Sequence, residues 1–228
     1  MACQGAREVL ASLSDSRVVP VVRVHSQASA RLAVEALITA GFKAAEITMT
    51  VPGAIDVIRD LSRDREFLVG VGTILNVQQV EASISAGARF VVSPVIVEGL
   101  ADLCRDADVL GIMSGLTPNE IFAAWQEGSG AVKVFPANSA GGPAHIKAIR
   151  DVFPEVPLIP TGGIDIHNLA HYLRAGAAFV GVGTDLVNEE HIAEGRIDTV
   201  IEMGRKYLQR ARKVEERGGC EPCICRRS

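Results

Sequence analysis

The sequence predicts one α/β domain of the (β/α)₈ class, a TIM barrel with an N-terminal helix. Short apolar segments alternate with amphipathic segments of helical period along the chain. The apolar segments are rich in Val and Ile, as expected for parallel strands that are buried on both faces. The length of 228 residues suits a single barrel. These three observations together favour a barrel.

The alternation predicts eight strands, each followed by a helix, after a first short helix over residues 7–13. The predicted strands are 18–24, 44–48, 67–72, 90–93, 109–113, 131–135, 157–160 and 179–182. The predicted helices that follow them are 26–40, 54–63, 76–86, 98–105, 117–127, 144–152, 165–175 and 198–212.

Local signals support these boundaries. Gly41, Gly87 and Gly176 each follow an alanine at a predicted helix end, where glycine supplies a left-handed cap. The segment Thr117-Pro118-Asn119-Glu120 has the spacing of a capping box, with proline at the first helical position. Asp165 is expected to cap the helix over 165–175.

A doubly wound open sheet is the alternative fold. It would normally carry a glycine-rich fingerprint after the first strand. Here the first strand ends in Val22-Arg23-Val24-His25, without a glycine. The barrel is therefore preferred.

Composition limits the classes of partner. The net charge of −4 and the lack of a basic stripe argue against nucleic-acid binding. No apolar run approaches the roughly 18 residues of a membrane span. The N-terminus lacks the features of a signal peptide, and the five cysteines are an odd number, so we expect a cytoplasmic protein without a disulfide framework.

We expect the barrel domain to occupy residues 1–212, followed by a polar tail, 213–228, that is disordered. Cys220, Cys223 and Cys225 in this tail have metal-ligand spacing, but three sulfurs in a short terminal segment are a weak zinc signal. His167 and His171 are four residues apart on a helix expected outside the barrel, where a solvated face is the simpler interpretation. No metal site is predicted.

Lys133 is the strongest chemical signal. It lies inside the apolar run Ala131–Val134 that ends at Phe135-Pro136, and the other four lysines have no such setting. Burial disfavours an ammonium and leaves more of the neutral amine, the nucleophile for a carbonyl carbon. The alternative is an edge-strand lysine whose ammonium reaches water along its aliphatic stem.

The carboxyl ends of barrel strands form one shared mouth, where active sites of this fold lie. Glu46 and Thr48 share one face of the second strand, and Lys133 and Phe135 share one face of the sixth. Arg23 ends the first strand. A carboxylate and an amine are therefore expected to face each other in the mouth, although a purely structural Glu46–Lys133 ion pair is the alternative.

Two glycine segments suggest an anion site. Thr161-Gly162-Gly163 follows the seventh predicted strand, and Gly183-Thr184 follows the eighth. Glycines allow backbone N–H groups to approach an anion, and this is the usual phosphate site of the fold. The alternative is that these glycines only make tight turns.

These motifs resemble those of the 2-keto-3-deoxy-6-phosphogluconate (KDPG) and 4-hydroxy-2-oxoglutarate aldolases, which are class I pyruvate aldolases. The resemblance runs from about residue 7 to residue 212, and the segments that carry it are Glu46-Ile47-Thr48, Val71-Gly72-Thr73, Ser93-Pro94, Lys133-Val134-Phe135-Pro136 and Pro160-Thr161-Gly162-Gly163. The resemblance implies cleavage of KDPG to pyruvate and glyceraldehyde 3-phosphate, without a metal or organic cofactor, by a homotrimer. Its small-molecule partners would be a keto acid and a phosphorylated aldehyde.

The resemblance also implies residue roles. Lys133 would form a Schiff base with pyruvate, and Glu46 would move protons through a water. The remaining implied contacts are Thr73, Pro94 and Phe135 with the pyruvate half, Thr161 with the aldol hydroxyl, and Gly162, Gly163, Gly183 and Thr184 with the phosphate.

The sequence departs from the family pattern at four places. Thr50 replaces an arginine that binds the pyruvate carboxylate in many members, and Arg23 is our candidate for the missing cation. Val95, Ser114 and the segment Ala137-Asn138-Ser139 also differ. These three leave the physiological aldehyde open, so a 2-keto-3-deoxy-6-phosphogalactonate aldolase is an alternative. A phosphosugar isomerase and a non-catalytic phosphosugar-binding barrel are further alternatives, but neither accounts for an amine in an apolar strand.

Overall fold

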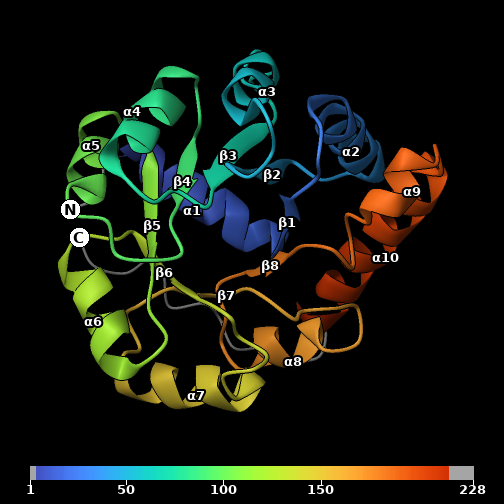
Figure 1. The fold of residues 1–228 in the computed structure, drawn as a ribbon. Helices are drawn as coiled ribbons and strands as arrows, with labels where there is room; N and C mark the ends of the chain where they lie inside the picture. The colour runs from blue at the N-terminus through green and yellow to red at the C-terminus, as the bar shows by residue number, and fades with distance from the viewer. Residues whose placement is uncertain (1–3, 216–228) are drawn as a thin grey trace.

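The computed structural model describes residues 4–215, and these residues form the predicted barrel (Figure 1). Eight parallel strands pair in the order β7-β6-β5-β4-β3-β2-β1-β8. They are β1 Val18–Val22, β2 Ala44–Thr48, β3 Leu68–Gly72, β4 Phe90–Val92, β5 Leu110–Ser114, β6 Ala131–Val134, β7 Leu158–Pro160 and β8 Val180–Val182.

The ring is completed between β7 and β8. Thr161 and Gly181 form a parallel bridge, and the Ala178 N–H donates to the Leu158 carbonyl at 2.9 Å. Closure matters for the site because it brings strands that are far apart in sequence to one interior.

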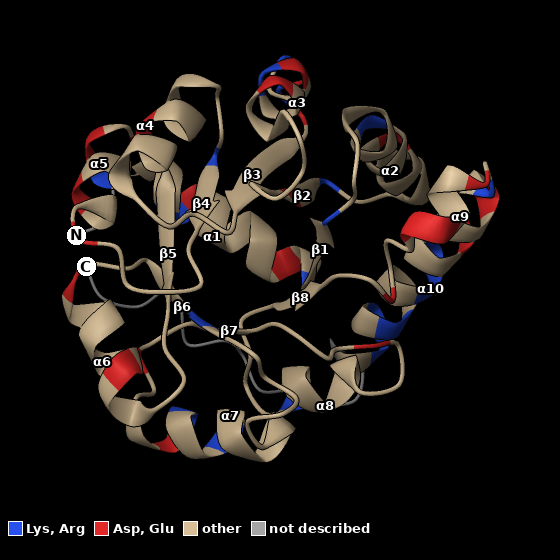
Figure 2. Ribbon diagram, viewed as in Figure 1, with Lys and Arg blue, Asp and Glu red and all other residues tan. Residues whose placement is uncertain are grey.

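An outer layer of helices surrounds the barrel, and most charged residues lie on this layer (Figure 2). The helices are α2 Gln27–Ala40, α3 Ala54–Leu61, α4 Val77–Ser85, α5 Leu100–Asp106, α6 Pro118–Gln126, α7 Gly142–Val152, α8 Leu169–Arg174, α9 Glu189–Ala193 and α10 Ile197–Glu215. Their apolar faces and the outward strand residues, such as Val22 and Ile47, make the larger of two cores. None of the described helices is long and apolar enough to cross a membrane.

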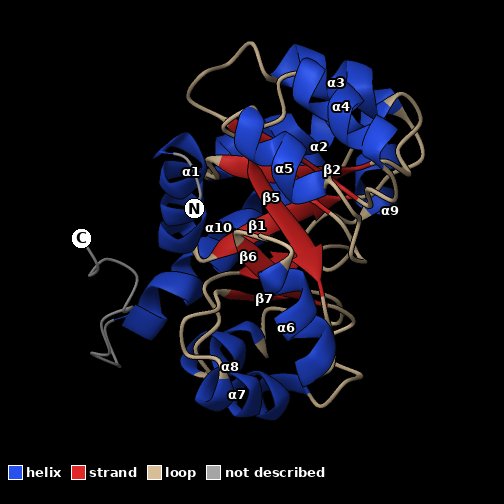
Figure 3. Cartoon of the chain, turned by 90° about the vertical axis from the view of Figure 1, so that its left-hand side faces the viewer, coloured by secondary structure: helices blue, strands red, loops and turns tan. Residues whose placement is uncertain are grey.

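The N-terminal helix α1, Gln4–Ser16, covers the end of the barrel at which the strands begin (Figure 3). Ala6, Val9 and Leu13 pack into a second core inside the barrel, together with Val19 and Phe90. This helix closes one end with apolar side chains, so the opposite end remains as the mouth.

Most of the expected local signals are confirmed. Gly41, Gly87 and Gly176 have φ values of 108°, 94° and 94°, in the left-handed region. Thr117 and Glu120 form the capping box at the start of α6.

Other expectations about boundaries are wrong. The helix after β7 starts at Leu169 with Asn168 as its N-cap residue. The Asp165 carboxylate instead accepts the N–H groups of His167 and Asn168, which forms a turn before the helix. Helix α9 has no counterpart among the predicted elements, because its five residues are too short for a periodic pattern.

The C-terminal helix α10 also differs from its prediction. It continues to Glu215 rather than ending at Arg212, since Val214 is buried and extends its apolar face. The rest of the predicted tail, residues 216–228 with Cys220, Cys223 and Cys225, lies outside the described residues.

Candidate active site

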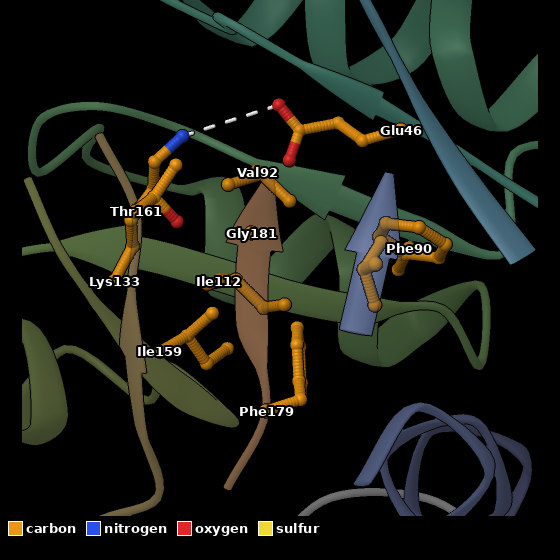
Figure 4. Close-up of a pocket in the computed structure, with 10 residues that line it drawn as sticks. Glu46, Phe90, Val92, Ile112, Lys133, Ile159, Thr161, Phe179 and Gly181 are labelled. Atoms are coloured by element: carbon orange, nitrogen blue, oxygen red, sulfur yellow. Dashed lines mark ion pairs between the residues drawn. The ribbon is translucent and has the colours of Figure 1, made fainter. Parts of the chain in front are cut away.

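Lys133 on β6 and Glu46 on β2 face each other inside the barrel (Figure 4). Strands β3, β4 and β5 separate them around the ring, so only barrel closure brings them together. The Lys133 Nζ lies 3.9 Å from the Glu46 Oε1, and the two side chains are 8% and 7% exposed. This low exposure rules out the alternative of a lysine that reaches bulk water.

A cavity of about 10 Å³ lies beside this pair, enough for a single water molecule. The Glu46 Oε1 accepts no hydrogen bond from any residue in the 4–215 range. A buried carboxylate oxygen without a donor is suited to hold a water or a substrate hydroxyl. Apolar side chains make most of the rest of the lining: Val19, Phe90, Val92, Ile112, Ile159 and Phe179.

Gly72 on β3 makes room for the Glu46 carboxylate. A Cβ atom at this position would lie 1.7 Å from the Glu46 Oε1 and 2.4 Å from its Cδ. Any side chain on Gly72 would therefore displace the carboxylate from its place near Lys133. Sequence reasoning named Gly72 only as part of the segment Val71-Gly72-Thr73 and missed this role, although a glycine within an apolar strand is a signal of close approach.

Two neighbours fix the surroundings of Lys133. The Ser114 hydroxyl donates to the Lys133 carbonyl at 2.9 Å, which ties β5 to β6 at this level. The ring of Phe135 has its centroid 5.4 Å from the Lys133 Nζ, a cation–π distance. Phe135 is itself 39% exposed, so it lies between the buried amine and the open mouth.

Thr161 lines the same cavity as Lys133 and Glu46. Gly181 on β8 accommodates it, since a Cβ there would lie 2.5 Å from the Thr161 Oγ1. The hydroxyl of Thr161 is thus held at the inner wall, within the group of residues that the sequence predicted for the site.

The next two residues, Gly162 and Gly163, need to be glycine for two reasons. Their φ values of 93° and 71° lie in the left-handed region. A Cβ on Gly162 would lie 3.1 Å from the Phe135 ring, and one on Gly163 would lie 2.5 Å from the Asn138 Cβ. The glycine loop is therefore covered by the segment that follows Lys133. It does not lead directly into a helix, because α8 begins only at Leu169.

Thr73 and Pro94 follow β3 and β4 and are half-buried, but neither lines the central cavity. Thr73 has a φ of 62°, an unusual conformation for a β-branched residue. Left-handed β-branched residues cost on the order of 1–3 kcal/mol and gather at functional sites. The strained backbone at Thr73 is thus a second indication that the mouth is the site.

Arg23 follows β1, and its side chain is exposed. Because Val21 pairs with Glu46, strand alternation continues to Arg23 on the interior face, beyond Glu46 toward the mouth. Arg23 does not line the cavity beside Lys133. The Thr50 hydroxyl, at the place of the usual family arginine, lies 2.7 Å from the Thr48 hydroxyl.

Thr184 is not brought to the Lys133 cavity. It is exposed and lines a separate open hollow of about 470 Å³ between the β8–α9 loop and α10, with His191 and Met203 among its other walls. Gly183, just after β8, is half-buried. Of the four residues predicted for the phosphate, Gly162 and Gly163 lie against the segment that follows Lys133 on β6.

Within residues 4–215, no group of three His, Cys, Asp or Glu side chains could hold a metal ion. His167 and His171 are both exposed, as predicted, but they do not share a helix, because α8 begins at Leu169 and His167 lies in the turn before it.

A closed (β/α)₈ barrel with a buried amine facing a carboxylate at its mouth defines an enzyme class suited to Schiff-base chemistry on carbonyl compounds. The family described as KDPG and KHG aldolase matches residues 9–203, and the chain belongs to this family. It is therefore an aldolase, a lyase.

Known proteins agree with this assignment. The 2-dehydro-3-deoxy-phosphogluconate aldolase of Pseudomonas aeruginosa is 32% identical over 197 residues, 86% of this chain and 90% of that protein. The KHG/KDPG aldolase of Escherichia coli is 31% identical over 201 residues, 88% and 94% of the two chains. A crystal structure of KDPG aldolase from Legionella pneumophila, with pyruvate captured as a covalent carbinolamine, is 30% identical, covers 90% of this chain and 98% of that one, and has a TM-score of 0.80.

Proposed function

We propose that this chain cleaves KDPG to pyruvate and glyceraldehyde 3-phosphate through a Schiff base on Lys133. The observation that carries the proposal is the buried pair of Lys133 and Glu46, 3.9 Å apart beside a cavity of about 10 Å³. A structural ion pair would not need the adjacent water-sized space or the Glu46 oxygen that lacks a donor. We extend the proposal to 4-hydroxy-2-oxoglutarate, which shares the keto-acid half and for which the Escherichia coli relative is also named.

The geometry accounts for each step. The neutral Lys133 amine adds to the C2 ketone, and loss of water from the carbinolamine gives an iminium. Glu46 takes the C4 hydroxyl proton through one water, and the electrons of the breaking C3–C4 bond pass to the iminium nitrogen. Glyceraldehyde 3-phosphate leaves, Glu46 returns a proton to C3 of the enamine, and hydrolysis releases pyruvate and the free amine.

The walls of the mouth supply binding contacts. We assign Thr73, Pro94 and Phe135 to the pyruvate half, since they follow β3, β4 and β6 at the mouth and the Phe135 ring lies beside the Lys133 amine. Thr161, inside the cavity, is assigned to the aldol hydroxyl. We assign the phosphate to Gly162 and Gly163, which lie against the segment that follows Lys133. Gly183 and Thr184, just after β8, are assigned to the phosphate because the loops after the seventh and eighth strands are the usual phosphate site of this fold.

Trapping tests the covalent step. With pyruvate and borohydride, we expect an irreversible adduct on the peptide that contains Lys133, read by mass spectrometry. Lys133→Arg keeps the positive charge but removes the nucleophile, so it should give no adduct and lose roughly 10⁴-fold or more in kcat. Trapping at another lysine, or turnover by Lys133→Arg, would contradict the mechanism. Binding of a phosphosugar without any turnover would favour a non-catalytic barrel.

Arg23 is assigned to the pyruvate carboxylate in place of the arginine that Thr50 replaces. Removing a charge-assisted contact costs about 1.5–3 kcal/mol, so Arg23→Ala should raise the KM for the keto acid by roughly 10- to 100-fold. Arg31→Ala is a matched control, because Arg31 pairs with Asp60 on the outer surface. An unchanged KM in Arg23→Ala would remove Arg23 from the site.

We also propose that residues 1–212 act as one domain in a cytoplasmic homotrimer. Exposed apolar side chains on the loops after β3 and β4, Leu75, Val95 and Ile96, support a protein interface next to the mouth. Sedimentation or light scattering should give three times the 24.2 kDa of one chain. A monomer at micromolar concentration would contradict the trimer and leave the aldolase assignment intact.

A further inference from the structure

The loop after β6 runs alongside the glycine loop after β7. The Ala137 N–H donates to the Thr161 carbonyl at 2.8 Å, and the Asn138 N–H donates to the Gly162 carbonyl at 3.1 Å. These successive hydrogen bonds continue the pairing of β6 with β7 beyond the ends of the strands. The backbone of Asn138 is thereby fixed relative to the loop that we assign to the phosphate.

The side chain of Asn138 lies directly against that loop. A Cβ on Gly163 would be 2.5 Å from the Asn138 Cβ and 3.2 Å from its Nδ2. The Gly163 carbonyl is already used, because the Asn168 Nδ2 donates to it at 2.9 Å. The Gly163 N–H, by contrast, donates to no acceptor in the described part of the chain. An unused backbone donor and the amide of Asn138 are therefore neighbours.

The Asn138 amide is available to a ligand. Its side chain is exposed and makes no hydrogen bond with another described residue. The glycine loop, residues 161–163, and the Gly183-Thr184 segment contain no lysine or arginine. An anion held there relies on neutral N–H donors, so one further donor would weigh heavily in its binding.

We propose that Asn138 is a specificity residue whose Nδ2 donates to the phosphate of the aldehyde half. This inference rests on the proposed aldolase function and deepens it. Asn138 selects phosphorylated over unphosphorylated aldehydes, while the pyruvate half of the reaction does not depend on it. A carboxylate of the same shape would repel the phosphate, and that difference provides the test.

The experiment measures aldol addition of pyruvate to glyceraldehyde 3-phosphate and to unphosphorylated glyceraldehyde. Asn138→Asp should lower kcat/KM for the phosphorylated aldehyde by roughly 30- to 100-fold, and Asn138→Ala by about 10-fold, mainly through KM. The kcat/KM of both variants for unphosphorylated glyceraldehyde should stay within about two-fold of the wild-type value. Inorganic phosphate should inhibit the wild type competitively and Asn138→Asp more weakly. Ser139→Asp places the same charge on the next exposed residue, whereas the three atoms nearest to a Cβ on Gly163 all belong to Asn138, so this variant should discriminate nearly as the wild type does.

Deuterium exchange into the methyl group of pyruvate separates this inference from the proposed function. The exchange involves only the pyruvate half of the site, with Lys133 and Glu46 as its reacting groups, so all Asn138 variants should exchange at the wild-type rate. Equal losses on both aldehydes, or unchanged discrimination in Asn138→Asp and Asn138→Ala, would overturn the role of Asn138. Absence of exchange in the wild type would instead overturn the aldolase mechanism.

Discussion

At the scale of single residues, the site depends on space as much as on charge. Glu46 reaches Lys133 because Gly72, on the neighbouring strand, has no side chain. Thr161 is held in the cavity wall because Gly181 has none. In both cases the glycine contributes no chemical group, and its value lies in the position that it leaves to a neighbour.

Gly72→Ala should therefore lower activity although it replaces neither Lys133 nor Glu46. The methyl group would overlap the Glu46 Oε1, placed 1.7 Å from the new Cβ, and would push the carboxylate aside. A displacement of about 1 Å costs roughly 100-fold in rate, so we expect kcat to fall by about that factor.

Two readouts distinguish this positioning effect from general damage. Borohydride trapping on Lys133 should persist in Gly72→Ala, whereas deuterium exchange into pyruvate, which needs Glu46, should slow about 100-fold. For the exchange assay, which does not involve the phosphate half to which Gly183 is assigned, Gly183→Ala serves as a packing control, because the nearest neighbour of its new Cβ would be the Val21 carbonyl oxygen, 4.0 Å away. Normal exchange in Gly72→Ala would show that Glu46 does not depend on this space.

At the scale of elements, α1 is held to the barrel by its N-terminal end. The Asp108 carboxylate, from the turn between α5 and β5, accepts the N–H groups of Gly5 and Ala6 at 3.1 and 3.2 Å. These are N–H groups of the first turn, which lack partners within a helix. Asp108 thus performs the function of an N-cap residue from about 100 residues away in sequence, as the two hydrogen bonds span 103 and 102 positions.

Asp108→Ala should destabilise the protein by about 1 kcal/mol or more through loss of this cap. Asp108 also has a φ of 55°, a conformation that aspartate and asparagine tolerate better than alanine does. Asp108→Asn is the matched control and should retain most of the stability. Urea denaturation followed by circular dichroism measures both. Equal stability of Asp108→Ala and wild type would mean that α1 is held by its apolar face alone.

At the scale of the whole molecule, α10 is tied to the end of the barrel through a buried phenol. Tyr207 on α10 is fully buried and donates a short hydrogen bond to the Asp185 carboxylate after β8. Burial, followed by the hydrogen bond and charge of Asp185, raises the pKa of Tyr207 well above its usual range. The folded protein therefore favours the neutral phenol.

The sign of this shift predicts the alkaline stability. An unfolded tyrosine ionises near pH 10, so the contribution of Tyr207 is complete below about pH 10 and is lost as the pH rises above it. At pH 8, Tyr207→Phe should cost about 1.5 kcal/mol, because Asp185 loses its donor. Between pH 9 and 11, the urea midpoint should fall more steeply in the wild type than in Tyr207→Phe. The pKa of Tyr172 is also raised, but this residue is present in both the wild type and Tyr207→Phe. Its effect on stability is therefore the same in the two proteins and does not contribute to their difference. If the urea midpoints of the two proteins fell in parallel with pH, Tyr207 would not be the source of the alkaline loss of stability.

The sequence alone predicted the barrel and singled out Lys133 and Glu46 as the candidate reacting residues. Strand and helix periods arise from local chemistry, and eight repeats of them, without a glycine-rich fingerprint after the first strand, favour a closed barrel over a doubly wound sheet. Lys133 was identified because an amine in an apolar strand is costly, and Glu46 because strand alternation placed it on the inner face. These arguments use only neighbours in the chain.

Only the tertiary structure decided how the parts meet. The 3.9 Å between Lys133 and Glu46, the space left by Gly72 and the contact of Asn138 with Gly163 all join different strands or loops. Their distances depend on register, closure and packing around the whole ring, which no local pattern encodes. For the same reason the sequence did not reveal that Thr184, just after β8, lines an open hollow beside α10.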